Sequence, residues 1–92
     1  MPDHATADLW LEHWQDESDA AFLYNVLASV ERDPRKRDVY NRLALVEERH
    51  TQLWAKLLND NGHRVPSGVA SPTLEARIKA KMGKWFGPGF LL

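Results

Sequence analysis

The sequence predicts an all-α fold, in which two long antiparallel helices form a four-helix bundle by homodimerisation and a short third helix follows. Residues 6–32 and 35–59 contain neither glycine nor proline, and they repeat apolar side chains at intervals of three and four, the period of an amphipathic helix. A short connection around Asp33 and Pro34 separates them, and two long helices joined by so short a turn fold back as a hairpin. The expectation of a dimer comes from polar residues within the apolar faces.

The first helix is expected over residues 6–32, with Asp3 or Thr6 as its N-cap. Short side chains that carry an oxygen accept hydrogen bonds from the free N–H groups of a first helical turn, which is why these two residues are candidates. The segment is rich in alanine, leucine and glutamate, and this composition favours a helix throughout.

The second helix is expected over residues 34–59. Asp33 is suited to be its N-cap, and Pro34 is suited to its first position, where the missing N–H costs nothing. The pair Asn61-Gly62 ends it, because glycine readily adopts the left-handed conformation that commonly follows a helix. The chain then enters a loop over residues 63–72.

Composition limits the chemistry that the chain can carry. Its 92 residues and 10.6 kDa correspond to one domain, and the lack of cysteine excludes disulfides, thiolate zinc sites, iron–sulfur clusters and cysteine nucleophiles. A net charge of −1 provides no basic field for nucleic acid. No apolar run approaches the roughly 20 residues that span a bilayer, and residues 1–10 lack the parts of a signal peptide, so we expect a cytoplasmic domain.

Charge divides the chain near residue 62. Residues 1–62 carry twelve acidic residues against seven Lys or Arg, whereas residues 63–92 carry one against five. We therefore expect a helical hairpin over 1–62, and a linker with a basic amphipathic helix at 73–86 over the rest. That helix suits either packing on the bundle or a membrane surface, where Trp85 and Phe86 would lie at the interface and the headgroups would meet Lys79, Lys81 and Lys84.

A second apolar face lies on the far side of the first helix. It consists of Phe22, Leu23, Val26 and Val30. Nothing in a bare hairpin covers it, so it needs either the third helix folded back or a contact with another protein.

Three polar residues fall inside the main apolar faces. Glu17 interrupts an aromatic stripe of the first helix, and Glu47 and His50 lie three residues apart on the apolar face of the second. His50 is at the centre of that face, which also carries Val39, Leu43, Val46, Leu53 and Leu57. An unpaired carboxylate buried there would be costly, so another group must compensate it.

The hairpin brings these three residues to the same height. Glu17 precedes Arg32 by fifteen residues and Glu47 follows it by fifteen, so folding the helices back about the turn places them level. A Glu and a His at positions i and i+3 can bind one ion through a carboxylate oxygen and an imidazole nitrogen. The sequence therefore predicts that Glu17, Glu47 and His50 are metal ligands.

These ligands amount to half of a known set. Di-iron carboxylate bundles use one Glu from each of two helices and a Glu-x-x-His pair from each of the other two. One hairpin supplies three of these six ligands, so two chains related by a two-fold axis would supply all of them. Oxygen and nitrogen ligands suit iron, with manganese as the alternative. We therefore expect a homodimer that holds two irons at its interface.

The residues around the ligands resemble the rubrerythrin-type ferritin-like domain at the N-terminus of bacterial members of the vacuolar iron transporter family, and the similar two-helix encapsulated ferritins. The resemblance spans about residues 9–62 and rests on three stretches: WQDESDAAFLY at 14–24, VERDP at 30–34 and YNRLALVEERH at 40–50, followed by Trp54 and Gly62. It is fairly specific, because the interval between Glu17 and Glu47 agrees together with the short Asp-Pro turn. It extends more weakly into the basic tail, which in that family precedes the membrane part.

The resemblance implies Fe(II) capture with oxidation by O₂ or peroxide, a ferroxidase-type oxidoreductase that passes iron to a transporter or a mineral store. Glu17, Glu47 and His50 carry over by motif as metal ligands and catalytic residues, with two irons per dimer. The family also implies a location at the cytoplasmic face of a membrane, beside a transport domain. The chain departs from the family by having no transmembrane segment and from full rubrerythrins by lacking their rubredoxin cysteines.

Each candidate also has a plainer interpretation. Glu47 and His50 would form a hydrogen-bonded core pair, and Glu17 would pair with Arg42 or Arg49. The aromatic residues nearest the ligands are either core or redox-active: Trp14, Tyr24, Tyr40 and Trp54. Surface charges are expected for Asp16, Asp19 and Glu48. Ordinary surface positions without partner spacing are expected for His4, His13 and His63.

The competing hypothesis for the whole chain is a non-catalytic dimeric interaction module. In that case Glu17, Glu47 and His50 form a buried polar network that fixes the register of the helices, and the basic tail docks on a membrane or a partner protein. The substitution Glu47→Ala separates the two hypotheses, because it relieves carboxylate repulsion in a metal-free site but weakens a structural network.

Overall fold

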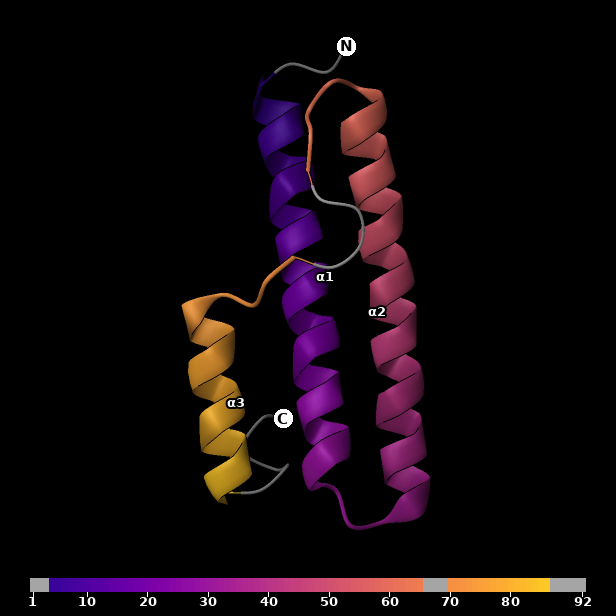
Figure 1. Ribbon diagram of the computed structural model, residues 1–92, viewed down its shortest axis with the longest axis vertical. Helices are drawn as coiled ribbons and strands as arrows, with labels where there is room; N and C mark the ends of the chain where they lie inside the picture. Colours follow the sequence, from indigo (N-terminus) through magenta and orange to yellow (C-terminus); the bar gives the residue numbers. More distant parts are fainter. Residues whose placement is uncertain (1–3, 66–69, 87–92) are drawn as a thin grey trace.

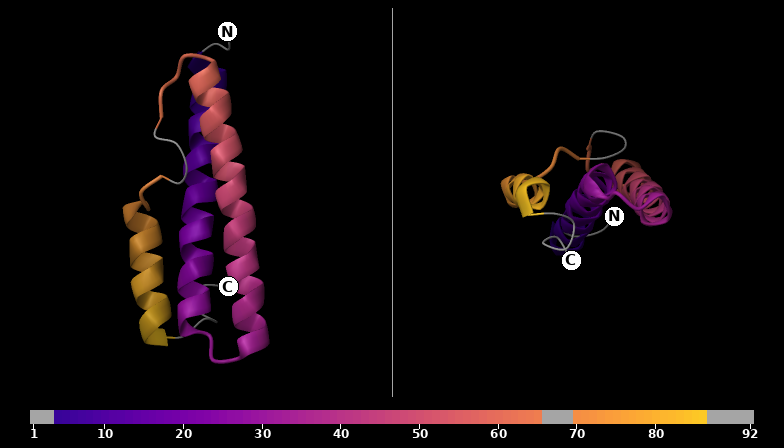
Figure 2. Two further views of the ribbon diagram at one scale, coloured as in Figure 1. Left: turned by 45° about the vertical axis from the view of Figure 1, so that its right-hand side comes forward. Right: turned by 90° about the horizontal axis from the view of Figure 1, so that it is seen from below.

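The computed structural model describes residues 4–65 and 70–86, which form three α-helices and no strand. They are α1 (His4–Val30), α2 (Pro34–Asp60) and α3 (Leu74–Phe86), so the all-α prediction is confirmed. Helices α1 and α2 run antiparallel along their full length, and α3 lies beside α1 on the side away from α2 (Figure 1, Figure 2). None of these helices is both long and apolar enough to cross a bilayer.

The predicted hairpin is confirmed, with small differences at the ends of α1. The helix begins at His4 rather than near Thr6, so Thr6 lies within its first turn and the prediction that Thr6 is the N-cap was wrong. Asp3, the other candidate, lies outside the described residues. At its far end the helix stops at Val30, two residues before the expected end.

Side chains and backbone of the connection hold the turn between α1 and α2. The Glu31 carboxylate accepts a hydrogen bond from the Asp33 N–H at 3.1 Å, and the Arg37 guanidinium donates to the Glu31 carbonyl oxygen at 3.1 Å. Asp33 is the N-cap of α2, as predicted: its Oδ1 accepts from the Arg35 N–H at 2.9 Å, and Pro34 follows as the first helical residue.

The end of α2 and the start of α3 follow the predicted signals to within one residue. Gly62 adopts a φ of 84°, and the next residue, His63, donates its N–H to the Leu58 carbonyl oxygen at 2.9 Å. Thr73 caps α3, because its Oγ1 accepts a hydrogen bond from the Ala76 N–H at 3.2 Å.

Small residues form the contact between α1 and α2. The buried residues of α2 are Ala44, Thr51, Ala55 and Leu58, and those of α1 include Trp14, Ala21 and Ala28. Alanines let the two backbones approach closely, so the seam runs along one edge of the apolar face of α2. The face centred on His50 is therefore only partly covered by α1: His50 contacts Glu17 of α1, whereas Leu53 is 66% exposed.

Helix α3 covers the second apolar face of α1. Its buried residues are again small, namely Ala76, Ala80 and Gly83, and α3 packs on α1 alone among the other helices. Val26 of that face is buried, and Leu23 borders the cleft between the two helices. Of the two covers considered for this face, the folded-back third helix is the one found.

Polar contacts fix the approach to α3. The Asp19 carboxylate accepts from the Thr73 hydroxyl at 2.6 Å and from the Thr73 N–H at 3.1 Å, so Asp19, expected as a surface charge, is half-buried in a contact with the segment before α3. Gln15 donates from Nε2 to the Ser71 carbonyl oxygen at 3.0 Å. These contacts join α1 to residues more than fifty positions later, a separation that helical periodicity does not encode.

Ser18 anchors the same segment from inside the fold. Its fully buried hydroxyl donates to the Trp14 carbonyl oxygen at 2.7 Å and accepts from the Ala70 N–H at 2.8 Å. We expect Ser18→Ala to lower the free energy of unfolding by about 1–3 kcal/mol, because it leaves the Ala70 N–H buried without an acceptor. Chemical denaturation measures this, and Ser29→Ala, the same change at an exposed position of α1, should cost no more than about 0.5 kcal/mol.

Candidate metal centre

Glu17 of α1 and Glu47 and His50 of α2 lie together at mid-height of the hairpin. One ligand atom from each lies within 4.8 Å of the others. The His50 Nδ1 atom is 3.2 Å from the Glu17 Oε2 atom and 3.7 Å from the Glu47 Oε2 atom. The expectation that the hairpin brings these three residues to one height is confirmed.

Two carboxylates therefore share one imidazole. Only the contact to Glu17 is short enough for a hydrogen bond, so Glu47 faces the ring without accepting from it. Within residues 4–65 and 70–86, no Lys or Arg pairs with Glu17, and the expected alternative partner Arg42 instead pairs with Asp38 at 3.0 Å. The group holds more negative charge than one imidazole can balance, as in a site built for a cation.

The donor set fits a divalent transition metal. With metal–ligand bonds of about 2.1 Å, two ligands on one ion lie roughly 3 to 4.2 Å apart, so side-chain movements of under about 1 Å bring all three atoms within range. Two carboxylate oxygens and one imidazole nitrogen are ligands that iron and manganese accept. Three protein ligands leave about half of an octahedral coordination sphere open.

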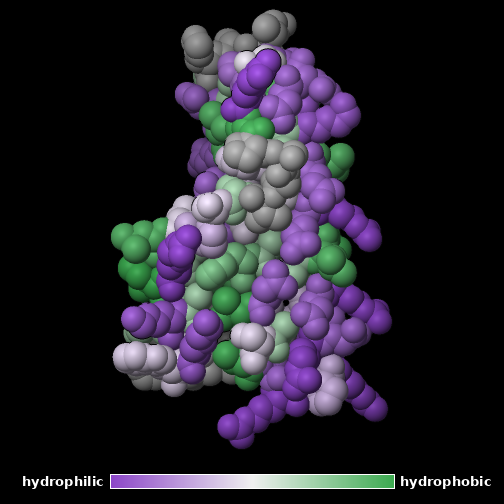
Figure 3. Space-filling view, viewed as in Figure 1, coloured by the Kyte–Doolittle hydropathy of each residue, from purple (hydrophilic) through white to green (hydrophobic). Residues whose placement is uncertain are grey.

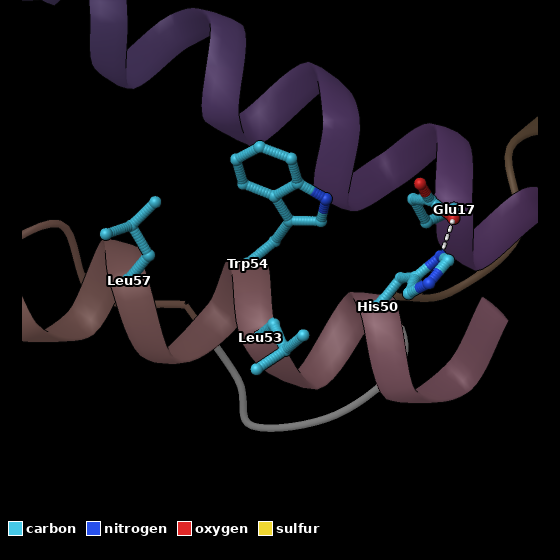
Figure 4. A pocket seen from close by; sticks show the side chains of 5 residues that line it. All are labelled: Glu17, His50, Leu53, Trp54 and Leu57. Atoms are coloured by element: carbon cyan, nitrogen blue, oxygen red, sulfur yellow. Dashed lines mark hydrogen bonds and ion pairs between the residues drawn. The ribbon is translucent and has the colours of Figure 1, made fainter. Parts of the chain in front are cut away.

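The open side of the centre is a groove of about 430 Å³. It is lined by Glu17, His50, Leu53, Trp54 and Leu57 (Figure 4). Glu17 reaches from α1 toward His50, and Trp54 extends from α2 toward α1. Because the His50 side chain is 45% exposed while the Glu17 and Glu47 side chains are 27% and 21% exposed, the centre lies at the surface of the single chain.

One helical turn from the ligand group, His13 of α1 stacks on Trp54 of α2, a pair that the sequence analysis did not predict. The rings of His13 and Trp54 are parallel to within 15°, with centroids 4.8 Å apart. The prediction that His13 is a surface residue without a partner was therefore wrong. A signal was present: His13 precedes Glu17 by four residues and Trp54 follows His50 by four, so the contact between Glu17 and His50 places His13 opposite Trp54.

The aromatic residues near the ligands differ in burial. Trp14 is buried, in a cluster with Ala55, Leu58 and Ala70, whereas Tyr24, Tyr40 and Trp54 are half-buried. Their burial agrees with a packing role.

No protein-family model matches the chain, and neither a curated protein nor a solved structure is detectably similar to it.

Proposed function

We propose that the chain is one half of a ferritin-like di-iron bundle, which captures Fe(II) at a centre shared by two copies and oxidises it. The observation that carries the proposal is the approach of Glu17, Glu47 and His50, from two helices, to within 4.8 Å of one another, with no Lys or Arg paired to Glu17 among the described residues. The resemblance to ferritin-like domains of iron transporters supports the same ligand set.

The surface around His50 supports the shared centre. Val39, Val46, His50, Leu53 and Leu57, which we call the α2 stripe, are exposed and follow one another at intervals of seven, four, three and four residues. Hydrophobic side chains appear along the outer edge of α2 in Figure 3. An exposed apolar stripe of this length is typical of a protein contact. A second copy packed on it would bury the leucines and bring a second Glu, Glu and His to the same place.

Iron is the substrate of the proposed reaction. Two Fe(II) ions each lose one electron to O₂, which takes up two protons and leaves as H₂O₂; with peroxide as oxidant, the two electrons and two protons yield two waters. The carboxylates stabilise the additional charge on Fe(III), and the apolar groove walls limit the access of water. The Fe(III) product would pass to a transporter or a mineral store.

The test is the rate of Fe(II) oxidation after anaerobic loading and a pulse of O₂. We expect the wild-type chain to form Fe(III) faster than iron in buffer, with up to one H₂O₂ released per two irons. Glu47→Ala should fall to the buffer rate, whereas Glu48→Ala, which removes the adjacent carboxylate, should keep the wild-type rate. Equal rates for wild type and Glu47→Ala would contradict the proposal.

A non-catalytic dimer is the second candidate, and the hydrogen bond between His50 and Glu17 is the observation that favours it. In this alternative the polar group fixes the register of the helices, as buried polar contacts do in coiled coils. The basic α3 then docks on a membrane or a partner, and the ligand group has no metal.

The stability of the metal-free chain separates the two candidates. We expect Glu47→Ala to raise the melting temperature by a few degrees, which corresponds to an increase of about 0.5–1 kcal/mol in the free energy of unfolding. The substitution removes a carboxylate that repels Glu17, while the hydrogen bond between His50 and Glu17 remains. Calorimetry in the presence of a chelator measures this change. A drop of similar size would favour the structural network.

A further inference from the structure

We propose that α3 binds an anionic phospholipid surface through its outward face. The inference does not depend on the metal centre. Small side chains of α3 pack against the protein, whereas the large apolar side chains of Leu74, Ile78 and Trp85 face solvent.

The exposed face of α3 contains most of its bulky apolar side chains. Leu74, Ile78 and Trp85 are 74%, 55% and 73% exposed. At intervals of four and seven residues they lie on one line along the helix, and they extend over about 17 Å. Figure 3 shows hydrophobic side chains gathered on the outer side of α3 with hydrophilic ones beside them. We call this line the α3 stripe.

The inward face explains why none of the described residues covers the α3 stripe. Ala76, Ala80 and Gly83 fill the contact with α1, and Val26 of α1 is buried there. A helix that served only to cover the apolar face of α1 would turn its largest residues inward. Helix α3 does the reverse: it turns small residues inward and exposes a tryptophan, a leucine and an isoleucine.

The orientation of α3 is fixed rather than free to turn. Thr73, its N-cap, is held by two hydrogen bonds to Asp19, and Ser71 is held by Gln15. Rotation that buried the α3 stripe would break these contacts and would place the side chain of Ile78 where Ala76 or Ala80 fits. The stripe is therefore presented outward in the folded chain.

Cations line one side of the α3 stripe, which favours a lipid surface over an apolar protein partner. Arg77, Lys81 and Lys84 follow its edge, and among the described residues none of them pairs with a carboxylate. The acidic residue of the helix, Glu75, pairs with Lys79 at 3.2 Å on the other side. Of the three lysines expected at headgroups, Lys79 is thus neutralised, and Arg77 takes its place. A row of cations beside a tryptophan-containing apolar line matches anionic headgroups above acyl chains.

The test is cosedimentation of the full chain with two kinds of vesicle: phosphatidylcholine alone, and phosphatidylcholine with about 30 mol% phosphatidylglycerol. We expect at least tenfold stronger partitioning into the anionic vesicles at about 50 mM salt, with most of that difference lost at high salt. Ile78→Ser should weaken binding about tenfold. The double variant Lys81→Ser/Lys84→Ser should weaken it about fivefold for each lysine.

Matched control variants test whether vesicle binding depends on the α3 stripe and the cations beside it. Leu45 of α2 is 54% exposed, nearly the same as Ile78, so Leu45→Ser removes an equally exposed apolar side chain and should bind as wild type. Lys56→Ser/Arg64→Ser removes the same charge from the end of α2 and the residues after it, outside α3, and should change binding by less than twofold. Glu47→Ala should also bind normally, so a failed metal centre leaves this proposal standing.

Two outcomes overturn the proposal. One is binding to anionic vesicles that Ile78→Ser and the lysine variant leave unchanged. The other is absence of vesicle binding together with self-association that Ile78→Ser abolishes, which would assign the α3 stripe to a contact between copies of the chain.

Discussion

Glu47→Ala is expected to abolish iron binding, with a loss of affinity for Fe(II) of more than about 100-fold. Even residues that only orient ligands contribute 10- to 100-fold to metal affinity, so removal of a ligand should exceed that range. Glu47 faces the same imidazole as Glu17 at 3.7 Å and has no other charged partner among the described residues, so nothing nearby replaces its oxygen. Anaerobic equilibrium titration with Fe(II), followed by the change in tryptophan fluorescence, measures the affinity.

Glu48→Ala is the matched control for this change. It removes a carboxylate from the next position of α2, outside the ligand group, and should leave the affinity within about twofold. The result that contradicts the assignment is an equal loss of affinity in both variants, which would indicate general attraction of the acidic hairpin for cations. His50→Ala should resemble Glu47→Ala.

Leu53→Glu is expected to break the proposed dimer, weakening association by at least about 100-fold. Leu53 is 66% exposed in the single chain, so the change should barely affect its fold, but in a dimer through the α2 stripe two glutamates would be buried without partners. Sedimentation velocity over a concentration series measures the association, and circular dichroism checks that the helices remain.

Leu45→Glu serves as the comparison, because Leu45 is a similarly exposed leucine of α2 outside the α2 stripe. It should leave association unchanged. If the centre is shared, Leu53→Glu also loses the two-iron complex although all three ligands are intact. A monomeric Leu53→Glu chain that still holds two irons would contradict the shared centre.

The helix ends were largely predictable because residues that start or end helices stand at those positions in the sequence. Asp33, Pro34 and Gly62 act within one turn of their own position, so their roles follow from their side chains and from the conformation each prefers. The meeting of Glu17, Glu47 and His50 was predictable for a related reason. Once the turn is known, an antiparallel hairpin fixes which residues are level, and Glu17 meets His50 as expected.

The lateral packing was not predictable in the same way. Periodicity gives the direction in which a helix is apolar, but it does not say which neighbour covers which edge. Helix α2 buries Ala44, Thr51, Ala55 and Leu58 and leaves several larger residues of its apolar face, such as Leu53, exposed. Helix α3 likewise buries Ala76, Ala80 and Gly83. Which residues α2 and α3 bury depends on how closely the backbones of the two packed helices approach. That distance is a property of the pair of helices and not of either sequence alone.

Contacts across long sequence separations also escaped prediction. Asp19 meets Thr73, and Ser18 meets Ala70, because the chain after α2 crosses back over α1. No local signal specifies that path. The same path determines which face α3 turns outward, so the case for the lipid surface needed the structure, although the basic amphipathic segment itself was visible in the sequence.

The most direct test of the shared centre is native mass spectrometry of the wild-type chain after anaerobic addition of Fe(II). We expect a dimer that carries two irons, and a loss of both irons in the Glu47→Ala chain. A chain that stays monomeric with and without Fe(II), or a dimer that takes up no iron, would contradict it.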